Sequence, residues 1–432
     1  MCAALNGGLS QKKGAYMAGK LALMGGRPVV EGPVAEPWPQ YDEAEAKALM
    51  EVLESRVWNH GPKCQEFEEA FARFQDAKYG VVCSGGTSAL EAVCRGAQIG
   101  VGDEVITSPY TFHGTCLGIL RAGAVVTFAD IDPETNNIDP DEIKAAITPR
   151  TKAVMVVHFG GLACDMARIQ EIADQHGLAV LEDACHGWGA QYAGRGLGSW
   201  GLASGISFQQ SKNMTGGEGG IALTNDETVA DIIHCALYAG RSRYDRAPEH
   251  LRWGANHRMN DLTAAVLLCQ LERVVAQTEI REQNAAMLTR TLSQLEGIEP
   301  IRRLPEATRV SWHIYGARFV QEEFEGVSRD LFMKALRAEG VPVGGGYSEP
   351  VYRNPVFQQD WESGPYRPFA WEDAPDYQDL YLPGVERYCK ERISLSQTVM
   401  LASEERMRDV ARAFEKVRDH ARELVAMSEL LS

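Results

Sequence analysis

Short apolar runs alternate with helical segments along most of this chain, and the alternation restricts its fold more than any other feature. The runs lie at residues 79–84, 103–108, 124–130, 152–159, 178–184, 204–208 and 219–225. Strands that alternate with helices form an α/β fold, with a mainly parallel sheet and helices on both of its faces. Ligands of such sheets bind beyond the carboxyl ends of the strands. We therefore expect functional residues directly after the apolar runs.

The length of the chain, 432 residues, exceeds what a single core usually accommodates, so we expect two domains. A long helical stretch at 260–295 looks like a connection between them, and the strands and helices after it form a smaller α+β unit. The expected division is an N-terminal arm at 1–30, a large α/β domain at 31–280 and a small C-terminal domain at 281–432.

Charge, cysteine content and hydropathy argue against several classes of protein. The net charge of −16 disfavours non-specific binding of nucleic acid, which needs a basic surface. The ten cysteines are spread out without a C-x-x-C pair, as in proteins of a reducing compartment, and their spacing indicates no metal site. Residues 1–28 contain no apolar stretch of membrane-spanning length. They also lack the succession of a charged start, an uninterrupted apolar stretch and a small-residue cleavage site that marks a signal peptide. These features predict a cytoplasmic protein without a metal.

Glycine and hydroxyl residues separate the first apolar run from the helix that follows it. Gly86, Thr87 and Ser88 lie at the expected start of this helix. A helix N-terminus presents free N–H groups and the positive end of the helix dipole, which together favour phosphate. The spacing matches neither of the common nucleotide-binding motifs, and an ordinary helix cap explains these residues equally well.

Two further strand ends carry candidate residues. Tyr110 and Phe112 follow the second run, where an aromatic ring could stack on a flat cofactor or simply pack under a helix. Asp183 lies at the carboxyl end of the run at 178–184. A buried carboxylate needs a partner, and either a protonated pyridine nitrogen or an ordinary salt bridge would meet that need.

Lys212 lies between the run at 204–208 and a glycine-rich segment at 216–220. A lysine in this position could bind phosphate, lie on the surface or act as a Schiff-base nucleophile, and the last role requires a pKa lowered by burial. This lysine, the strand-end carboxylate, the candidate phosphate cradle and an aromatic ring are the parts of a pyridoxal phosphate site. Their common position along one sheet favours this interpretation over coincidence.

The sequence resembles the sugar aminotransferases of the DegT/DnrJ/EryC1/StrS family, which are pyridoxal-phosphate enzymes of fold type I. The similarity is carried by the segments SGGTSAL, SPYTF, VHFGG, EDACHGWGA, SFQQSKNMTGGEGG, GANHRMNDLTAAVLLCQLERV and SWHIYGARF. Within them, the element S-F-x-x-x-K-N-x-T-x-G-E-G-G is highly specific. With weaker similarity beyond these segments, the resemblance covers nearly all of the chain after the N-terminal arm.

The resemblance implies roles for individual residues. Lys212 would link covalently to the cofactor and then move the substrate proton, Asp183 would keep the pyridine nitrogen protonated, and Phe112 would stack on the ring. The other cofactor contacts that it implies are Gly86, Thr87, Ser88 and Ser207 at the phosphate, His186 at the ring hydroxyl, and Asn256 at the phosphate of the neighbouring subunit. The contact across subunits implies a homodimer with shared active sites.

Departures from the family pattern bear on the substrate. His186 stands where many members have Gln, and Gln209 and Gln210 replace a His-Pro or His-Ala pair that is common in members acting on nucleotide sugars. The run from Ser207 to Gly220 is similar to the branch that acts on cyclitols and on aminohydroxybenzoate precursors.

These similarities imply an aminotransferase that moves an amino group from L-glutamine or L-glutamate to a ketone on a cyclitol or sugar. Secondary metabolism, such as aminoglycoside or aminosugar biosynthesis, is the implied setting. Two alternatives stay open. One is a pyridoxal-phosphate dehydratase similar to aminohydroxybenzoate synthase, and the other is an inert homologue that serves as a partner or regulator.

Several polar and aromatic residues are candidates for contact with the keto substrate. His313 and Tyr315 could face the substrate or belong to the core, and Tyr110 follows a strand end. Tyr347 belongs to an aromatic loop that could close over the site or could be packing. Arg241 lies in an arginine-rich segment that could attract a nucleotide diphosphate, although charged runs usually face water.

Overall fold

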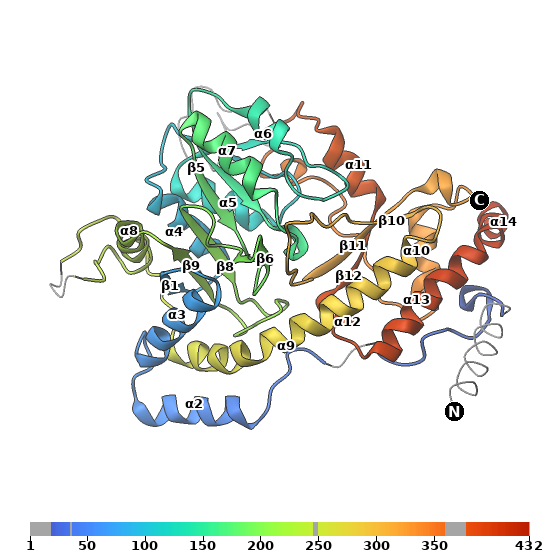
Figure 1. The fold of residues 1–432 in the computed structure, drawn as a ribbon, viewed down its shortest axis with the longest axis horizontal. Coiled ribbons are helices and arrows are strands. Elements are labelled where there is room, and N and C mark those ends of the chain that lie inside the picture. Colours follow the sequence, from blue (N-terminus) through green and yellow to red (C-terminus); the bar gives the residue numbers. More distant parts are fainter. Residues whose placement is uncertain (1–18, 35–36, 245–248, 359–376, 432) are drawn as a thin grey trace.

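The computed structural model describes residues 19–34, 37–244, 249–358 and 377–431. Figure 1 shows a large body of strands and helices, a smaller body with its own sheet, and a long helix, α9 (Asp261–Leu292), that runs beneath both. The expected fold class is confirmed, because a mainly parallel sheet flanked by helices is joined to a smaller C-terminal sheet. No helix in the described ranges is long and apolar enough to cross a membrane.

The large sheet has seven strands in the order β1-β9-β8-β5-β4-β2-β3. These strands are β1 (Tyr79–Cys83), β2 (Glu104–Thr107), β3 (Val125–Phe128), β4 (Thr151–Val157), β5 (Ala179–Asp183), β8 (Ala203–Ser207) and β9 (Gly220–Thr224). Strand β9 is antiparallel to both of its neighbours, whereas the pairs from β8 to β3 are parallel. The carboxyl ends of β1, β2, β5 and β8 therefore lie at one edge of the sheet.

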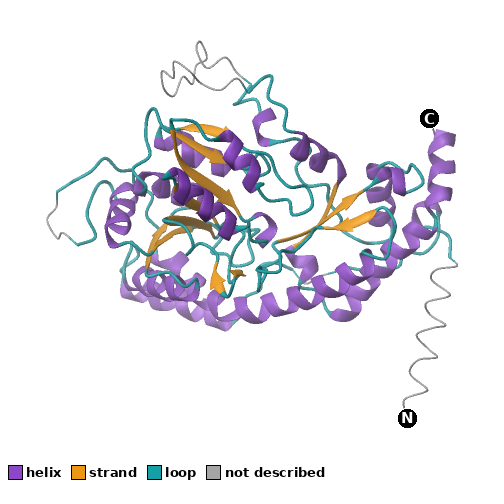
Figure 2. Cartoon of the chain, turned by 45° about the horizontal axis from the view of Figure 1, so that its top comes forward, coloured by secondary structure: helices purple, strands orange, loops and turns teal. Residues whose placement is uncertain are grey.

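Helices cover both faces of this sheet (Figure 2). They are α3 (Pro62–Phe74), α4 (Gly86–Gly96), α5 (His113–Ala122), α6 (Pro140–Ala146), α7 (Met166–His176) and α8 (Glu227–Leu237), with α2 (Glu43–Ser55) outside α9. Successive strand residues point to opposite faces. Accordingly, Val81 joins the apolar cluster that contains Leu90 of α4, and its neighbour Val82 joins the cluster that contains Phe67 of α3.

The smaller sheet is antiparallel, in the order β10-β11-β12. Its strands are β10 (Ile298–Pro300), β11 (Ile314–Phe319) and β12 (Arg392–Ser396), and the later helices are α10 (Arg329–Ala338), α11 (Pro383–Glu391), α12 (Gln397–Met400), α13 (Glu404–Asp419) and α14 (Ala421–Leu431). The remaining elements are a ribbon of β6 (Gln191–Tyr192) and β7 (Arg195–Gly196) and 3-10 turns at Ala22–Met24, Phe159–Gly161, Gln321–Glu323 and Val351–Arg353.

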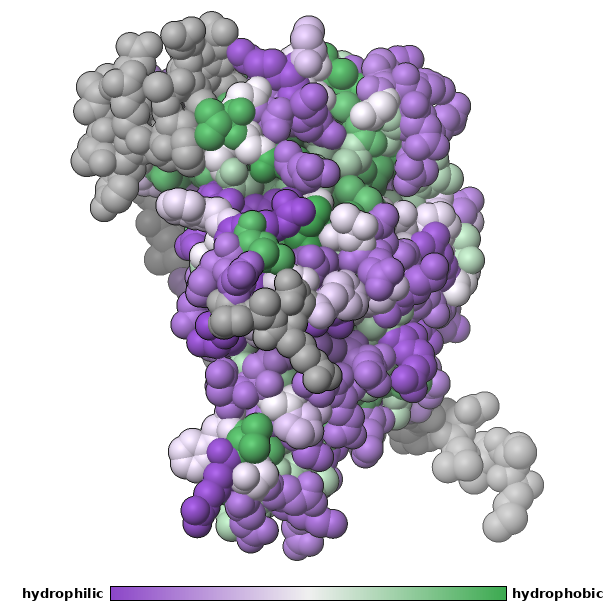
Figure 3. Space-filling view, turned by 90° about the vertical axis from the view of Figure 1, so that its left-hand side faces the viewer, coloured by the Kyte–Doolittle hydropathy of each residue, from purple (hydrophilic) through white to green (hydrophobic). Residues whose placement is uncertain are grey.

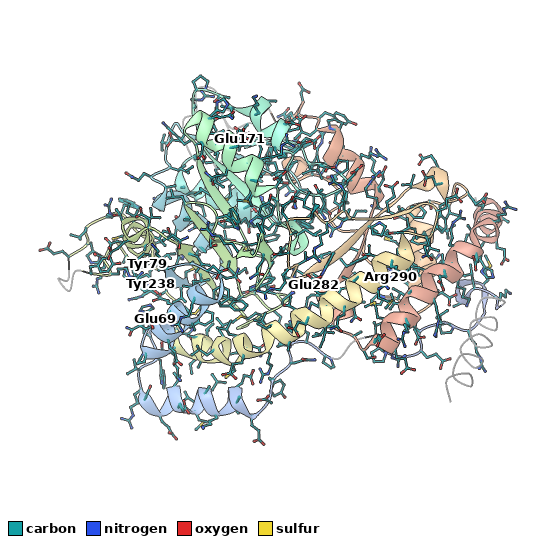
Figure 4. The ribbon with its side chains drawn as sticks, in the orientation of Figure 1. Glu69, Tyr79, Glu171, Tyr238, Glu282 and Arg290 are labelled. Atoms are coloured by element: carbon teal, nitrogen blue, oxygen red, sulfur yellow. The ribbon has the colours of Figure 1, made fainter. Side chains whose placement is uncertain are left out.

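Helix α9 links the two sheets. Glu282 and Arg290 lie on the part of α9 that runs beneath the smaller sheet (Figure 4). The carboxylate of Glu282 accepts hydrogen bonds from the backbone N of Val310 at 2.7 Å and from Nε1 of Trp312 at 3.2 Å. These bonds fasten the segment before β11 to the helix. The expected domain boundary between residues 280 and 281 lies inside α9, and this division stays a prediction.

The described part of the expected N-terminal arm packs against the smaller body. The Glu339 carboxylate accepts hydrogen bonds from the backbone N of Ala22 at 2.8 Å and of Val29 at 3.0 Å, and it pairs with Lys416 at 3.0 Å. A buried carboxylate is stable here because a cation and two backbone amides satisfy it. The rest of the expected arm, residues 1–18, lies outside the described residues.

Candidate active site

A cavity of about 530 Å³ lies where the strands of the large sheet end and β11 of the smaller sheet begins. The predicted substrate contacts His313 and Tyr347 line it. So do the predicted cofactor contacts Gly86, Thr87, Ser88, Phe112, Asp183, His186, Ser207 and Lys212. Residues that are far apart in the sequence thus meet at the expected edge of the sheet.

The start of α4 forms an anion-binding corner of this cavity. The backbone amide of Ala89 makes the first hydrogen bond of the helix, so the amides of Gly86, Thr87 and Ser88 have no acceptor within it. A Cβ atom at residue 86 would lie 2.7 Å from Cβ of Ser207, so only glycine lets the helix end approach the end of β8 this closely. Three amides and the Ser207 hydroxyl therefore surround a space of the kind that a phosphate fills.

Asp183, the last residue of β5, is buried, and both of its carboxylate oxygens accept hydrogen bonds. Oδ1 accepts from the backbone N of Cys185 at 3.0 Å, and Oδ2 accepts from Oγ1 of Thr115 at 2.6 Å. The Thr115 hydroxyl lies 2.6 Å from that of Thr111, which supports it in turn. These bonds fix the carboxylate at the cavity wall. Sequence reasoning missed Thr115, although its spacing of four from Thr111 at the start of α5 offered a signal.

Lys212 lies in the loop that leaves β8 and returns as β9. The backbone N of Phe208 donates to the carbonyl of Gly219 at 2.8 Å, and the backbone N of Gly216 donates to the carbonyl of Phe208 at 3.1 Å. Gly219 has a φ of 142°, a conformation that residues with side chains rarely adopt. The loop therefore closes on Phe208 and holds the lysine over the cavity, which explains the glycines that follow it.

The ammonium of Lys212 has neither an ion pair nor a hydrogen bond with any described residue. Its Nζ lies 5.9 Å from the centroid of the Trp188 ring. Burial lowers the pKa of Lys212, and the neighbouring Cys185 and Asp183 oppose the shift without cancelling it. A larger fraction of this lysine is therefore a neutral amine than of an exposed lysine at the same pH.

His186 and His313 face each other with ring centroids 4.3 Å apart. Nδ1 of His186 accepts from the backbone N of Gly160 at 3.2 Å, which leaves Nε2 as the donor of the neutral ring. Nδ2 of Asn213 donates to the carbonyl of Ser311 at 2.7 Å, so Oδ1 accepts from Nδ1 of His313 at 2.9 Å. Burial, reinforced by the nearby lysine, lowers the pKa of both histidines well below the usual range. Both rings are therefore neutral, with Nε2 of His186 a donor and Nε2 of His313 an acceptor.

Phe112 caps the start of α5 at the cavity, and 62% of its surface is exposed. An aromatic ring is usually buried on one or both faces, because its apolar area is costly to leave in water. This ring is therefore free to stack on a flat ligand, as the resemblance implies.

Two predicted substrate contacts do not line the cavity. Tyr315 follows Ile314, which does line it, and the alternation of side chains along β11 turns Tyr315 to the opposite face. The Tyr315 hydroxyl lies 2.9 Å from that of Thr289 on α9. Tyr110 is fully buried and its hydroxyl accepts a hydrogen bond from Arg392. The structure thus places both tyrosines in the core. For Tyr315, this is the second of the two positions that the sequence left open.

Arg241 and Asn256 follow α8 and also lie outside the cavity lining. Asn256 pairs with Tyr238 in an antiparallel bridge, and its Oδ1 accepts from Nε of Arg258 at 2.9 Å. The carbonyl of Arg241 accepts from Nδ1 of His234 at 2.8 Å. The contact of Asn256 with a neighbouring subunit stays a prediction.

Comparison with known proteins points to one family. The model of the DegT/DnrJ/EryC1/StrS aminotransferase family matches residues 39–415. The spore coat polysaccharide biosynthesis protein SpsC of Bacillus subtilis is 37% identical over 394 residues, which cover 88% of this chain and 95% of that protein. The L-glutamine:2-deoxy-scyllo-inosose aminotransferase of Streptomyces kanamyceticus is 34% identical over 428 residues, which cover 94% of this chain and 99% of that protein. The crystal structure of 3-amino-5-hydroxybenzoic acid synthase matches with a TM-score of 0.80 and 30% identity, covering 92% of this chain and 100% of that chain.

Proposed function

The chain belongs to the DegT/DnrJ/EryC1/StrS aminotransferase family, and we propose that it transfers the amino group of L-glutamine or L-glutamate to a ketone on a cyclitol or sugar ring. Enzymes of this family depend on pyridoxal phosphate. The observation that carries the proposal is the unpaired ammonium of Lys212 in the same cavity as Asp183 and the N-terminus of α4. We further propose that the reaction belongs to secondary metabolism, such as the biosynthesis of an aminoglycoside or aminosugar.

The cavity residues fit pyridoxal phosphate. The free amides at the start of α4 and the Ser207 hydroxyl suit its phosphate, and the exposed ring of Phe112 suits its flat pyridine. Asp183 would pair with the pyridine nitrogen, Nε2 of His186 would donate to the ring oxygen, and Lys212 would hold the cofactor covalently. When bound, the cofactor stabilises negative charge that develops at the carbon bearing the amine.

The protein's own contribution is to move protons and to fix charges. Nζ of Lys212, with its lowered pKa, would accept a proton from the α-carbon of the amino donor in the first half of the reaction. In the second half, it would deliver a proton to the former ketone carbon of the acceptor. Asp183 keeps a fixed direction because Thr115 and the backbone of Cys185 hold its oxygens. Nε2 of His313 would accept a hydrogen bond from a hydroxyl of the ring substrate. Together these groups would orient a polyhydroxylated ketone in the cavity.

The names of the relatives support this substrate class. One is called a spore coat polysaccharide biosynthesis protein, and another is named for L-glutamine as its amino donor and 2-deoxy-scyllo-inosose as its acceptor. Arg241 lies outside the cavity lining, so within one chain it gives no support to a nucleotide diphosphate contact. A free cyclitol or a simple sugar ketone is therefore our preferred acceptor.

The match with 3-amino-5-hydroxybenzoic acid synthase favours a second candidate function. A dehydratase of that kind would use the same lysine to remove a proton while water leaves the ring. It would need the same cofactor contacts, so the cavity suits both reactions. The two functions differ in what they consume, since the dehydratase requires no amino donor and forms an aromatic product.

The visible absorption spectrum of the protein reconstituted with pyridoxal phosphate tests the proposal. We expect a visible cofactor band that is lost on addition of L-glutamine or L-glutamate, which would also identify the donor. The resulting aminated enzyme would then be mixed with cyclitol and sugar ketones. A band that neither donor changes would contradict the aminotransferase function and favour the dehydratase. Failure to form any band would contradict the role of Lys212.

We also propose that the enzyme is a homodimer with shared active sites. Large apolar side chains on α2, just after α2 and after α8 are exposed on the single chain, including Met50 at 53%, Trp58 at 52% and Trp253 at 88%. Figure 3 shows the face that carries both segments, where hydrophobic patches interrupt a mostly polar surface. Exposed apolar area of this kind marks interaction surfaces. Asn256 lies in the same region, which agrees with the contact across subunits that the resemblance implies.

A further inference from the structure

Arg392, the first residue of β12, is a buried cation without a carboxylate partner. Only 1% of its surface is exposed, and none of the described residues forms an ion pair with it. Its Nη1 donates to the hydroxyl of Tyr110, its Nε has no acceptor, and its guanidinium lies 4.9 Å from the centroid of the Phe159 ring. Leaving a charge buried and unpaired is costly, so an anionic partner is missing.

Three other lysine or arginine side chains among the described residues are deeply buried, but each either pairs with a carboxylate or lies outside the lining of the two cavities at the junction of the sheets. Lys416 pairs with Glu339 at 3.0 Å, and Arg318 pairs with two glutamates at 2.7 Å each. Arg281 lacks a carboxylate but donates to the backbone and side chain of Gln397, and it lines neither cavity at the junction of the two sheets.

Arg392 lines a second cavity of about 580 Å³, which shares the residues Tyr347 and Ile314 with the cavity of Lys212. Arg337 lines it as well, and the described lining contains no aspartate or glutamate. The second cavity is therefore a positively charged chamber directly beside the reaction site. An anion that enters from the reaction site meets two guanidinium groups.

The charge of Arg392 also reaches the reaction cavity itself. Burial is the main reason for the low pKa of His186, and the positive charges of Lys212 and Arg392 lower it further. Burial is also the main reason for the low pKa of His313, and the positive charges of Lys212, Arg281 and Arg392 lower it further. Lys212 lines the first cavity and Arg392 the second, and the two cavities share Ile314 and Tyr347. A ligand that extends from one cavity into the other would therefore have a reactive end at the lysine and an anionic end at the arginine.

We propose that Arg392 binds the α-carboxylate of the amino-acid donor while the donor amine reaches toward Lys212. Because Nη1 is used by Tyr110, Nε and Nη2 remain for a side-on, two-bond contact with a carboxylate. Tyr347 and Ile314, which border both cavities, would lie along the donor between its two ends. The assignment rests on the proposed aminotransferase function and names how that function selects its donor.

The test compares L-glutamine with 4-aminobutanamide, which is the same molecule without its α-carboxylate. The rate of loss of the cofactor band would be measured for the reconstituted wild type and for Arg392→Gln, with Arg392→Lys as the variant that keeps the charge. We expect Arg392→Gln to lose about 10²-fold in efficiency toward L-glutamine and little toward 4-aminobutanamide. Arg392→Lys should retain part of the preference. Arg281→Gln, which changes another buried arginine, should leave the preference as in the wild type.

Equal losses toward both amines in Arg392→Gln would show a structural role and overturn the proposal, and so would an unchanged preference for L-glutamine. Glutaramate, which keeps the carboxylate but lacks the amine, gives a second readout by calorimetry on the protein. It should bind to the wild type and at least tenfold more weakly to Arg392→Gln.

In the reconstituted protein, where the cofactor would fill the anion-binding corner at α4, inorganic phosphate would compete only for other anion sites. Binding of phosphate that is tighter than that of glutaramate and is lost in Arg392→Gln would assign the site to a substrate phosphate and overturn the donor role. If the wild type reacts with no donor, the proposed function fails, and the glutaramate titration still decides whether Arg392 receives a carboxylate.

Discussion

Lys212 and Asp183 line one cavity, yet no ion pair joins them in the described structure. A direct pair would hold the lysine as an ammonium and would occupy the carboxylate. Instead, Asp183 is held by Thr115 and a backbone amide, and Lys212 lies free with a lowered pKa. At the scale of single residues, this separation keeps one group available for a covalent bond and the other for a pyridine nitrogen.

Replacement of Lys212 by alanine should abolish turnover, because no amine remains to hold the cofactor or to move the proton. A loss of at least about 10²-fold in kcat is expected from removal of the general base alone. Steady-state amino transfer from the donor found by the absorbance test would measure it. Lys144→Ala, which removes an exposed lysine from α6, is the matched control and should behave as the wild type. Full activity of Lys212→Ala would refute the assignment.

Asp183→Asn should keep part of the cofactor but lose about 10²–10³-fold in kcat, because a neutral amide no longer holds the pyridine nitrogen protonated. Thr115→Val, which removes a hydrogen bond to the carboxylate, should have a smaller effect of about tenfold. Both effects would be followed by kcat and by the position of the cofactor band. A rate for Asp183→Asn within a few-fold of the wild type would exclude this role.

At the scale of elements, the start of α4 and the loop between β8 and β9 bring the site together. Gly85 and Gly219 form a bridge between the two segments, so the phosphate corner and the lysine loop are parts of one backbone contact. A helix of eleven residues supplies free amides and a positive dipole end at this point. The backbone therefore contributes as much to the expected phosphate contact as any side chain.

Gly86→Ala should weaken the binding of pyridoxal phosphate by at least about tenfold, because the new Cβ would lie 2.7 Å from Cβ of Ser207 and push the helix end away. Titration of the cofactor band would measure the affinity, and thermal unfolding would report the loss of packing. Gly100→Ala is the control, since a Cβ at residue 100 would meet no atom within 4 Å. Unchanged affinity in Gly86→Ala would show that the start of α4 does not bind the cofactor phosphate.

At the scale of the whole molecule, the reaction cavity exists because α9 holds the smaller sheet against the edge of the large one (Figure 1). The loop before β11, which carries His313, is fastened to α9 through Glu282. The exposed apolar side chains of α2 and of the segment after α8 lie on the outside of this arrangement. They are the surface through which we expect a second copy to complete the site.

The proposed dimer should persist at assay concentration in sedimentation velocity experiments. Trp253→Asp should shift the protein toward monomers and lower its activity, because a buried unpaired charge is costly in an apolar interface. Val101→Asp, at another exposed apolar residue, is the control and should leave the assembly unchanged. Fully active monomers of the wild type would contradict both the dimer and the role of Asn256.

Local patterns in the sequence determined the fold class and the main members of the candidate site. Apolar runs and helical periodicity reflect the chain's own geometry, so they predicted the parallel sheet and the edge at which its ligands bind. Lys212, Asp183 and Gly86 could be singled out because each lies at the end of a strand or within a few residues after it. The spacing around Lys212 also carried the family resemblance, which matches the family found by comparison.

Only the tertiary structure decided which side chains face the cavity and which partners they have. Tyr315 and Ile314 are neighbours in the sequence, but the way β11 packs on α9 turns Tyr315 into the core. The tautomers of the two histidines and the support of Asp183 by Thr115 depend on contacts between separate elements. Arg392 meets Tyr110 across 282 residues of chain. Such contacts leave no periodic or spacing signal, because they are set by packing between elements rather than by the geometry of any one of them.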